Sequence, residues 1–567
     1  MSRCPTFLML LPLSALVACG DSANKSSAGS PAGDTAEAGD TADEADSGDT
    51  SDSGEPDTPV DADGDGLDDT EDCDDNDDTV GLPALWYADA DGDGYGDPAR
   101  STEACEAPAD HVDNADDCDD SSAMALPGGL ETCDALDNDC NGVVDDGDSF
   151  TPVPATSPDA LQSAIDSAEA GDLLCVGPGT HGAISLTSQI VHLVGAAGSE
   201  ATILDAEGSS RTINSQGSQL VVEGLTLRGG TTGDGFRGAA LWVHGGVFTA
   251  TDLVIDDVQQ QDTAVQGVVA VSSTPGFTAD GLVLRDLDID VNADIEGIIH
   301  FSSAGGTLRN VTIQDNHIAG NSVYGGVLAL SSTVTVEDLD VLSNTYEGSR
   351  TACYAFIAEG GSRTSTLTRA RVIDNATLGS SASGGAVCAR HYGGVVVRNL
   401  LVAGTESGEW SGSGPLVASS SGATLDAAHI TVVGLDTVYG GLLHSWTNAD
   451  SQISVRNAVV VDTHTDLGAL SYLSASDGAD VELAWVTHSG LTSDDGELHA
   501  GTPGGDWTTT DIHAGTVVFE DTSAASMLDW DFRLAAGSAG IDAGDPSLTD
   551  PDGSACDLGA FGGPDAW

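Results

Sequence analysis

Residues 297–325 read GIIHFSSAGGTLRNVTIQDNHIAGNSVYG, and they decide the fold because the chain repeats this pattern many times. The segment begins with a small residue, continues into an apolar run, turns at small polar residues and enters a second β-rich run at Thr307–Ile313. A repeat of this length that holds short β-rich runs and no helical pattern is typical of one coil of a β-solenoid.

The same spacing recurs along most of the chain. Small residues precede apolar runs every 27 to 30 residues, at Gly238, Gly267, Gly297, Gly326, Ala355, Gly385, Gly414, Gly441 and Gly468. Two positions later stands an apolar column that we expect to face the core, namely Ala240, Val269, Ile299, Leu328, Ile357, Val387, Leu416, Leu443 and Leu470. Asn316, Asn344 and Asn375 follow the second run, at a turn where side chains can stack between coils.

This pattern resembles the right-handed parallel β-helix of pectate-lyase-like and related surface proteins over residues 160–500. The amphipathic residues 158–169 predict a helix before the first strand. We therefore expect an all-β solenoid, with an N-terminal helix and cap at 149–192 and a parallel β-helix at 193–500. Residues 501–567 resemble the closing segment of bacterial β-helix surface proteins, and they are expected to cap the open end of the sheet.

Residues 59–148 contain three combs of acidic residues around a glycine, spaced like EF-hand-type calcium loops. The second comb has Arg100 where a bidentate acid is expected, so this loop should be weaker or use Glu103 instead. A disordered acidic tract is the alternative. The predicted ligands, with backbone carbonyls at Leu67, Tyr95 and Val143, are Asp61, Asp63, Asp65, Leu67, Asp69, Asp72, Asp89, Asp91, Asp93, Tyr95, Asp97, Asp137, Asp139, Asn141, Val143, Asp145 and Asp148.

Acidic residues dominate the composition. There are 92 acidic and 16 basic residues in 567, and the formal net charge is −76. Such a surface repels nucleic acid and attracts divalent cations, so nucleic-acid binding is excluded. Residues 20–58 hold no aromatic residue and cannot bury enough apolar surface to fold, so 19–58 is predicted to be an acidic disordered linker.

The N-terminus has the pattern of a targeting segment. Arg3 precedes an apolar run at 7–17 that is too short to span a membrane. The following Leu16-Val17-Ala18-Cys19 resembles a bacterial lipobox, which implies a signal peptide at 1–18, lipidation of Cys19 and a lipid anchor in the membrane. Gly20 in place of aspartate implies the outer membrane and cell surface of a bacterium. An ordinary cleaved signal peptide is the alternative.

Part of the acidic region resembles the metal-binding repeats of MopE-type bacterial surface proteins and, more distantly, thrombospondin type 3 repeats. Trp86–Asp97, Asp117–Asp120 and Glu131–Gly142 carry the resemblance. It implies divalent-metal loops stapled by disulfides. The family name is associated with copper, but this stretch has a single histidine, His111, and its oxygen ligands fit calcium better. Calcium is therefore the predicted cofactor.

Cysteines of an exported chain can form disulfides. We predict the local pairs Cys105–Cys118 and Cys133–Cys140 within the calcium module. A bridge between Cys353 and Cys388 is not expected, because the two occupy positions of opposite parity in neighbouring coils.

One column of charged residues is predicted on the solenoid surface. Aligning the second runs gives the order Arg309, Glu337, Arg369, Arg398, Ala427 and Arg456. Neighbouring coils lie about 4.8 Å apart, so these side chains can touch. The four arginines are candidates for binding a carboxylated or sulfated polysaccharide. The alternative is a solvated stripe in which Glu337 bridges Arg309 and Arg369.

No catalytic motif is evident, and no catalytic residue is predicted. The single lysine, Lys25, lies in the linker, so the Arg-x-Lys of polygalacturonase-type enzymes is absent. We predict a cell-surface lipoprotein that binds calcium and presents a β-helix for adhesion or polysaccharide binding, with polysaccharide or another surface protein as partner. The alternatives are a surface-anchored polysaccharide lyase or hydrolase, which as an enzyme would be a calcium-dependent lyase, and a purely structural stalk.

Overall fold

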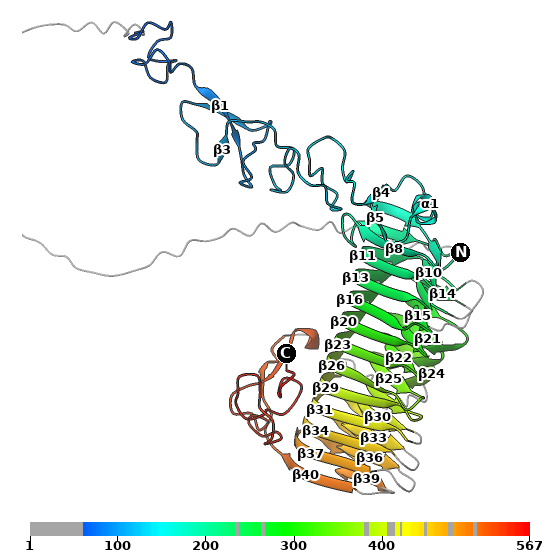
Figure 1. Ribbon diagram of the computed structural model, residues 1–567. Helices are drawn as coiled ribbons and strands as arrows, with labels where there is room; N and C mark the ends of the chain where they lie inside the picture. The colour runs from blue at the N-terminus through cyan, green and yellow to red at the C-terminus, as the bar shows by residue number, and fades with distance from the viewer. Residues whose placement is uncertain are drawn as a thin grey trace, which may run out of the picture. The chain divides into compact units, whose positions relative to one another are not determined.

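The computed structural model describes residues 60–566 except 233–236, 262–266, 379–384, 405–413, 420–421, 447–450, 475–479, 503–506 and 525 (Figure 1). It divides into two units, Met1–Leu82 and Pro83–Trp567, which are treated separately below. The predicted signal peptide, Cys19 and the acidic linker lie outside the described residues. No helix in the part of the chain that the structure describes is long and apolar enough to cross a membrane.

A parallel β-solenoid forms most of the second unit, which confirms the predicted fold (Figure 1). Short strands form one sheet: β7 (Ile184–Thr187), β10 (Ile213–Gln216), β12 (Leu241–His244), β15 (Val269–Ser272), β19 (Ile299–Ser302), β22 (Val327–Leu330), β25 (Phe356–Glu359), β28 (Val387–Arg390), β30 (Leu416–Ser419), β33 (Leu443–Trp446), β36 (Ser471–Ser474) and β39 (His499–Thr502).

Mostly longer strands form the second sheet: β4 (Thr151–Val153), β5 (Asp172–Val176), β6 (Gly179–Gly182), β8 (Ile190–Gly195), β9 (Thr202–Asp205), β11 (Gln219–Arg228), β13 (Val247–Asp256), β16 (Gly276–Arg285), β20 (Gly305–Gln314), β23 (Thr333–Leu342), β26 (Thr364–Ile373), β29 (Gly394–Ala403), β31 (Thr424–Val433), β34 (Gln452–Val461), β37 (Asp480–Ser489) and β40 (Trp507–Ala514). The third side carries β14 (Gln259–Gln261), β17 (Asp288–Asp290), β18 (Asp294–Glu296), β21 (His317–Tyr324), β24 (Thr345–Ala352) and β27 (Ala376–Leu378), then β32 (Asp436–Tyr439), β35 (His464–Leu467) and β38 (Thr492–Ser493).

Neighbouring coils pair in register, so each coil adds one residue to a core column. In the short strands this column runs Leu241, Val269, Ile299, Val327, Phe356, Val387, Leu416 and Leu443. The predicted core column agrees with this register at Val269, Ile299, Val387, Leu416 and Leu443. It is shifted by one residue at Ala240, Leu328, Ile357 and Leu470. The cause is a run of small residues, such as Gly325-Gly326, in which either residue can start the repeat.

Each ten-residue strand is bent by one residue in the left-handed backbone region, for example Asn310 (φ 50°) in β20 and Asn399 (φ 55°) in β29. A second turn follows each strand, and there the predicted asparagine stack is confirmed. Asn316 donates its side-chain N–H to Asn344 at 2.8 Å, and Asn344 donates to Asn375 at 2.9 Å. The three side chains are buried, so the ladder satisfies polar groups inside the turn.

The N-terminal end of the solenoid carries the predicted helix, α1 (Ala160–Ser167), which buries Leu161 and Ile165. Before it lies a loop-rich region with one small antiparallel sheet of β1 (Ala84–Ala88), β2 (Ser101–Ala104) and β3 (His111–Val112).

The C-terminal segment does not cap the open end of the solenoid as predicted. After β40 the chain turns back along the outer face of the long-strand sheet, through β41 (Phe519–Asp521), η1 (Met527–Asp529) and β42 (Asp531–Leu534) (Figure 1). Phe532, Leu558 and Ala560 pack against the outward side chains of β26, β29, β31 and β34. The sheet is apolar on its outer face there, so burying this face outweighs covering the edge of the last coil.

Candidate functional site: metal loops and a surface cleft

The first loop lies in the first unit and closes around its own aspartates. Asp61 accepts the backbone N–H groups of Gly64 at 2.7 Å and Gly66 at 3.2 Å, while Asp65 accepts that of Leu67 at 2.8 Å. Gly66 has φ 105°, a conformation that favours glycine. Carboxylate oxygens of Asp61, Asp63 and Asp65 therefore lie within 4.8 Å of one another.

The second loop, in the second unit, repeats this geometry. Asp89 accepts from Gly92 at 2.8 Å and Gly94 at 3.2 Å, and Gly94 has φ 94°. Carboxylate oxygens of Asp89, Asp91 and Asp93 lie within 4.8 Å of one another.

The third loop follows the same pattern but recruits a residue that the sequence analysis missed. Asp137 accepts from Gly142 at 2.7 Å, and Gly142 has φ 93°. The gathered carboxylates are those of Asp137, Asp139 and Glu131, within 4.8 Å. Glu131 is 6% exposed, and its Oε1 accepts the backbone N–H of Asp139 at 2.8 Å.

Asp117 and Asp120 complete the second loop in place of Arg100 or Glu103. The Asp120 carboxylate accepts the backbone N–H of Ala90 at 2.6 Å, and Asp117 is 4% exposed and close enough to Asp91 and Asp93 for their charges to act on it. Arg100 instead forms an ion pair with Asp120 at 3.2 Å.

A sequence signal for these two residues existed. The tetrapeptide Asp-Cys-Asp-Asp occurs at 72–75 and again at 117–120. In the first loop Asp75 accepts the N–H of Ala62 at 3.0 Å, as Asp120 does from Ala90 in the second loop. The segment that carries β2 and β3 separates the second tetrapeptide from its loop, so the sequence analysis missed the correspondence.

Each loop holds covered carboxylate oxygens that no donor within the described residues reaches. These are Oδ2 of Asp63, Asp72, Asp91, Asp93 and Asp117, and Oε2 of Glu131. Burial, reinforced by neighbouring carboxylates, raises the pKa of Asp63, Asp91 and Asp117. Covered carboxylate oxygens without donors are costly in the ionised state, and a cation relieves that cost.

Five predicted acidic ligands lie outside the gathered loop carboxylates, and Asp72 is one of them, although its charge acts on Asp63. Asp69 accepts the N–H of Val60 at 3.4 Å, Asp97 accepts that of Ala99 at 2.7 Å, and Asp148 is exposed. Asp145 is buried at 6% exposure and accepts the N–H groups of Asp134 and Ala135 at 3.1 and 3.2 Å. The backbone of Leu67, Tyr95 and Val143 donates to position 5 of its own loop.

Disulfides bind the second and third loops to each other and to the solenoid, but not in the predicted pairs. Cys118 is bonded to Cys140, and Cys133 is bonded to Cys175 in β5. Cys105 is disulfide-bonded too, so all four predicted cysteines are oxidised. The local pairs are wrong because the Asp-Cys-Asp-Asp turn packs on the third loop, where Cys118 Sγ lies 3.3 Å from the Asp137 carbonyl oxygen.

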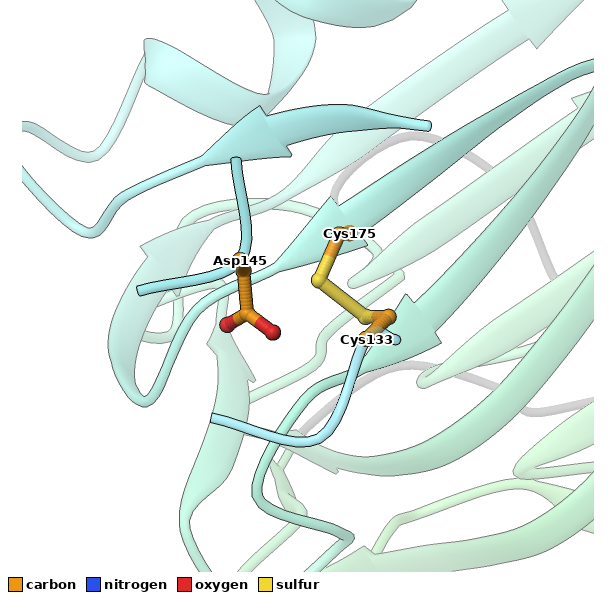
Figure 2. Close-up of side chains that lie close together, drawn as sticks. All are labelled: Cys133, Asp145 and Cys175. Carbon is orange, nitrogen blue, oxygen red and sulfur yellow. A yellow bond between two sulfur atoms is a disulfide. The ribbon is translucent and has the colours of Figure 1, made fainter. Parts of the chain in front are cut away.

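Figure 2 shows Asp145 beside the Cys133–Cys175 bond. These three side chains lie close enough to suggest a metal group, yet both sulfurs are consumed in the disulfide and cannot act as thiolate ligands. Asp145 is a structural residue here, because its oxygen ties down the backbone that follows Cys133.

A disulfide between Cys353 and Cys388 also forms, contrary to expectation. Cys353 follows the end of β24 and lies in the turn before β25, so the parity of a strand does not apply to it. Both cysteines sit in a small apolar cluster on the outer side of the short strands with Leu328, Ile357 and Val417. Among the described cysteines, Cys556 is free and buried.

The predicted arginine column is interrupted. Arg369 does not align with Glu337, whose register partner is Thr368, because Arg369 occupies the left-handed bend (φ 54°). Ala428 rather than Ala427 stands between Arg398 and Arg456. Every predicted arginine is paired with a carboxylate: Arg309 with Glu337 at 3.0 Å, Arg369 with Asp338 at 2.6 Å, Arg398 with Asp426 at 2.7 Å and Arg456 with Asp426 at 2.8 Å.

A cleft of about 530 Å³ lies where the C-terminal segment leaves the long-strand sheet. Its floor is formed by outward side chains of β20, β23, β26 and β29, and its wall by residues of η1, β42 and the final turn. The polar and aromatic residues that line it include Asn310, Thr312, Asp338, Asp340, Arg369, Arg371, Asp529, Trp530, Asp531, Phe532 and Phe561.

Comparison with known proteins supports the metal-binding part of this description. A family model for MopE-type copper binding, described as "Putative metal-binding motif", matches residues 117–146, a range that includes Asp117, Glu131 and the third loop. No curated protein matches the chain.

Among solved structures, the chain is similar to the A-module of a mannuronan C-5 epimerase of Azotobacter vinelandii, with 16% identity and a TM-score of 0.32 over 65% of this chain and 97% of that one. It is also similar to the catalytic domain of a GH87 α-1,3-glucanase in complex with nigerose (13%, TM-score 0.36, 64% and 68%) and to the GH87 catalytic unit of Streptomyces thermodiastaticus (15%, TM-score 0.31, 65% and 69%). The chain thus combines a MopE-type metal-binding motif with a parallel β-solenoid.

Proposed function

We propose that this protein is a lipid-anchored bacterial surface protein that binds calcium through its aspartate loops and presents its solenoid to polysaccharide. The observation that carries the calcium part is the set of covered, donor-less carboxylate oxygens in all three loops. The gathered side chains offer oxygen alone, and hard cations such as calcium prefer oxygen ligands.

The residues that would hold the cation differ slightly between loops. The first loop offers Asp61, Asp63, Asp65 and Asp72; the second offers Asp89, Asp91, Asp93, Asp117 and Asp120; the third offers Asp137, Asp139, Asn141 and Glu131. Bound calcium would neutralise the repulsion between these carboxylates and thereby order the loops. Backbone N–H groups already fix the first aspartate of each loop, so little rearrangement is needed.

Calcium titration of the full-length protein, stripped of metal by a chelator, tests this proposal. We expect calcium to release or absorb heat and to protect residues 60–148 from proteolysis, and Asp91→Asn to weaken one class of sites. Asp97→Asn is the matched control, because Asp97 lies in the same loop but outside the gathered carboxylates. If calcium produced neither heat nor protection, the calcium proposal would be refuted. Tight copper binding in the same titration would show that the loops bind copper instead.

Surface anchoring rests on Leu16-Val17-Ala18-Cys19. In a bacterial host, radiolabelled fatty acid should be incorporated into the protein, and Cys19→Ser should abolish this incorporation and release the protein from the membrane fraction. Release of the unchanged protein would favour an ordinary cleaved signal peptide.

A second candidate function is a polysaccharide lyase or hydrolase, and one observation favours it. The cleft gathers the carboxylates of Asp338, Asp340, Asp529 and Asp531, and enzymes that cleave glycosidic bonds use paired carboxylates. Three of the four, Asp338, Asp340 and Asp531, are held by arginine, which favours binding over proton transfer. If incubation with polysaccharide produced new reducing ends, the protein would be a hydrolase, and unsaturated products would identify a lyase.

A further inference from the structure

The cleft on the long-strand sheet has a flat, charged floor whose charges are matched in pairs. Arg369 donates Nε and Nη2 to the two carboxylate oxygens of Asp338 at 2.6 and 2.8 Å. Arg371 binds Asp340 on the neighbouring coil in the same bidentate way. Such pairs are planar and rigid, and they hold both partners at fixed positions on the sheet.

The charge of this floor selects against an anionic ligand. Arg369 and Arg371 are neutralised by their aspartates, and Asp531 is paired with Arg533. Asp529 has no ion pair within the described residues, so the lining keeps an acidic excess. The whole chain carries a formal net charge of −76, which further repels a polyanion. A carboxylated or sulfated polysaccharide therefore fits this surface poorly, although arginine alone would suggest one.

The remaining chemistry suits a neutral sugar chain. A guanidinium has five N–H donors and a bidentate pair uses two, so each arginine–aspartate pair still offers donors beside carboxylate acceptors, the combination that hydroxyl groups require. Trp530 and Phe561 supply aromatic surface on the wall, against which the C–H face of a sugar ring can pack. A volume of about 530 Å³ lies within the usual ligand-pocket range of roughly 300–1,000 Å³.

We propose that this cleft is the binding site for a neutral polysaccharide, held by the paired side chains of β23 and β26 below and by the aromatic rings of the C-terminal segment above. The inference rests on the proposed function. It specifies where on the solenoid the polysaccharide binds and that this polysaccharide is uncharged. The floor spans four successive strands, β20, β23, β26 and β29, whose coils repeat at a constant spacing along the sheet, as sugar units repeat along a chain.

Affinity electrophoresis of the full-length protein in calcium tests the proposal, with dextran, mannan and laminarin as neutral probes and dextran sulfate and alginate as anionic ones. Thr312→Trp should abolish retardation, because Thr312 points from β20 into the cleft. Thr307→Trp is its matched control: the same residue type on the same strand and equally half-buried, but outside the lining. Trp530→Ala should weaken binding about fivefold by removing aromatic contact.

The outcomes separate the cleft from the general function. Retardation by a neutral probe that is lost in Thr312→Trp and kept in Thr307→Trp supports the cleft. Retardation that survives in both variants overturns the cleft but leaves a polysaccharide-binding solenoid. Retardation by the anionic probes alone overturns the charge argument, and no retardation by any probe overturns both the cleft and the polysaccharide part of the proposed function. Equal thermal midpoints of the variants exclude misfolding as the cause.

Discussion

Removing the Cys118–Cys140 disulfide is expected to weaken calcium binding at the second and third loops. The bond closes a loop with a sequence separation of 22 residues. In the chain-entropy description such a cross-link stabilises the folded state by about 3 kcal/mol, because it restricts the unfolded chain. Cys118 directly follows Asp117, and Cys140 directly follows Asp139. Removing the disulfide therefore loosens the calcium-binding residues themselves. If calcium must supply that free energy, its affinity falls by up to about 100-fold.

The double variant Cys118→Ala/Cys140→Ala is compared with wild type by calorimetric titration with calcium at fixed ionic strength. Cys353→Ala/Cys388→Ala is the control, since it removes a disulfide of the solenoid and leaves the loops untouched. Unchanged calcium affinity and stoichiometry in the first variant would refute the coupling. Peptide mapping that found Cys118 bonded to Cys105 would refute the pairing on which it rests.

Three further predictions follow from named contacts. Asp117→Asn should weaken calcium binding at one class of sites, while Asp116→Asn, on an exposed neighbour, should not; equal effects would contradict the role of Asp117. Burial holds the pKa of His300 at about 4, below its ordinary 6.5, although Glu296 lies 3.7 Å from its Nδ1. As the pH falls, His300 is therefore protonated in the unfolded chain before it is in the folded protein. The free energy of unfolding decreases between about pH 6.5 and pH 4, by about 2.5 kcal/mol at pH 4.5. His300→Gln should remove this share of the pH dependence in urea denaturation, and an unchanged slope would contradict it. Asn344→Ala should lower the free energy of unfolding by about 2–4 kcal/mol, because it leaves ladder neighbours unpaired in the interior; a loss below about 1 kcal/mol would show the ladder to be dispensable.

Most of the fold could be predicted from the periodicity of the sequence. A coil that buries one side of two strands must repeat its apolar positions, so the repeat near Ile299 identified the solenoid, and Asn344 marked its buried turn. The register of single residues was harder to predict, because a sequence pattern does not distinguish Gly325 from Gly326. The structure pairs Ile299 with Val327, which makes Gly325 the counterpart of Gly297. The path of the C-terminal segment was not predictable, since it depends on outward apolar residues such as Leu401 that look like core residues in sequence.

The loop ligands illustrate a different limit. The first three oxygen-bearing side chains of each loop are local and follow from spacing, as Asp61 and Asp89 show. Residues that come from outside the loop, such as Asp117 and Glu131, require knowledge of how the chain after or before the loop folds back onto it. The disulfide partner of Cys133 lies in β5, beyond the module itself, and no local rule reaches it.

The two interlocked disulfides also define how a pull on the chain would travel. Tension applied N-terminal to Cys118 can cross to Cys140, run through the short segment 133–140, and cross again to Cys175 in the first coils of the solenoid. That covalent route bypasses most of the backbone between 118 and 175, leaving it slack. The segment under strain contains Asp137 and Asp139, so a cation held there would stiffen the covalent link between this region and the solenoid.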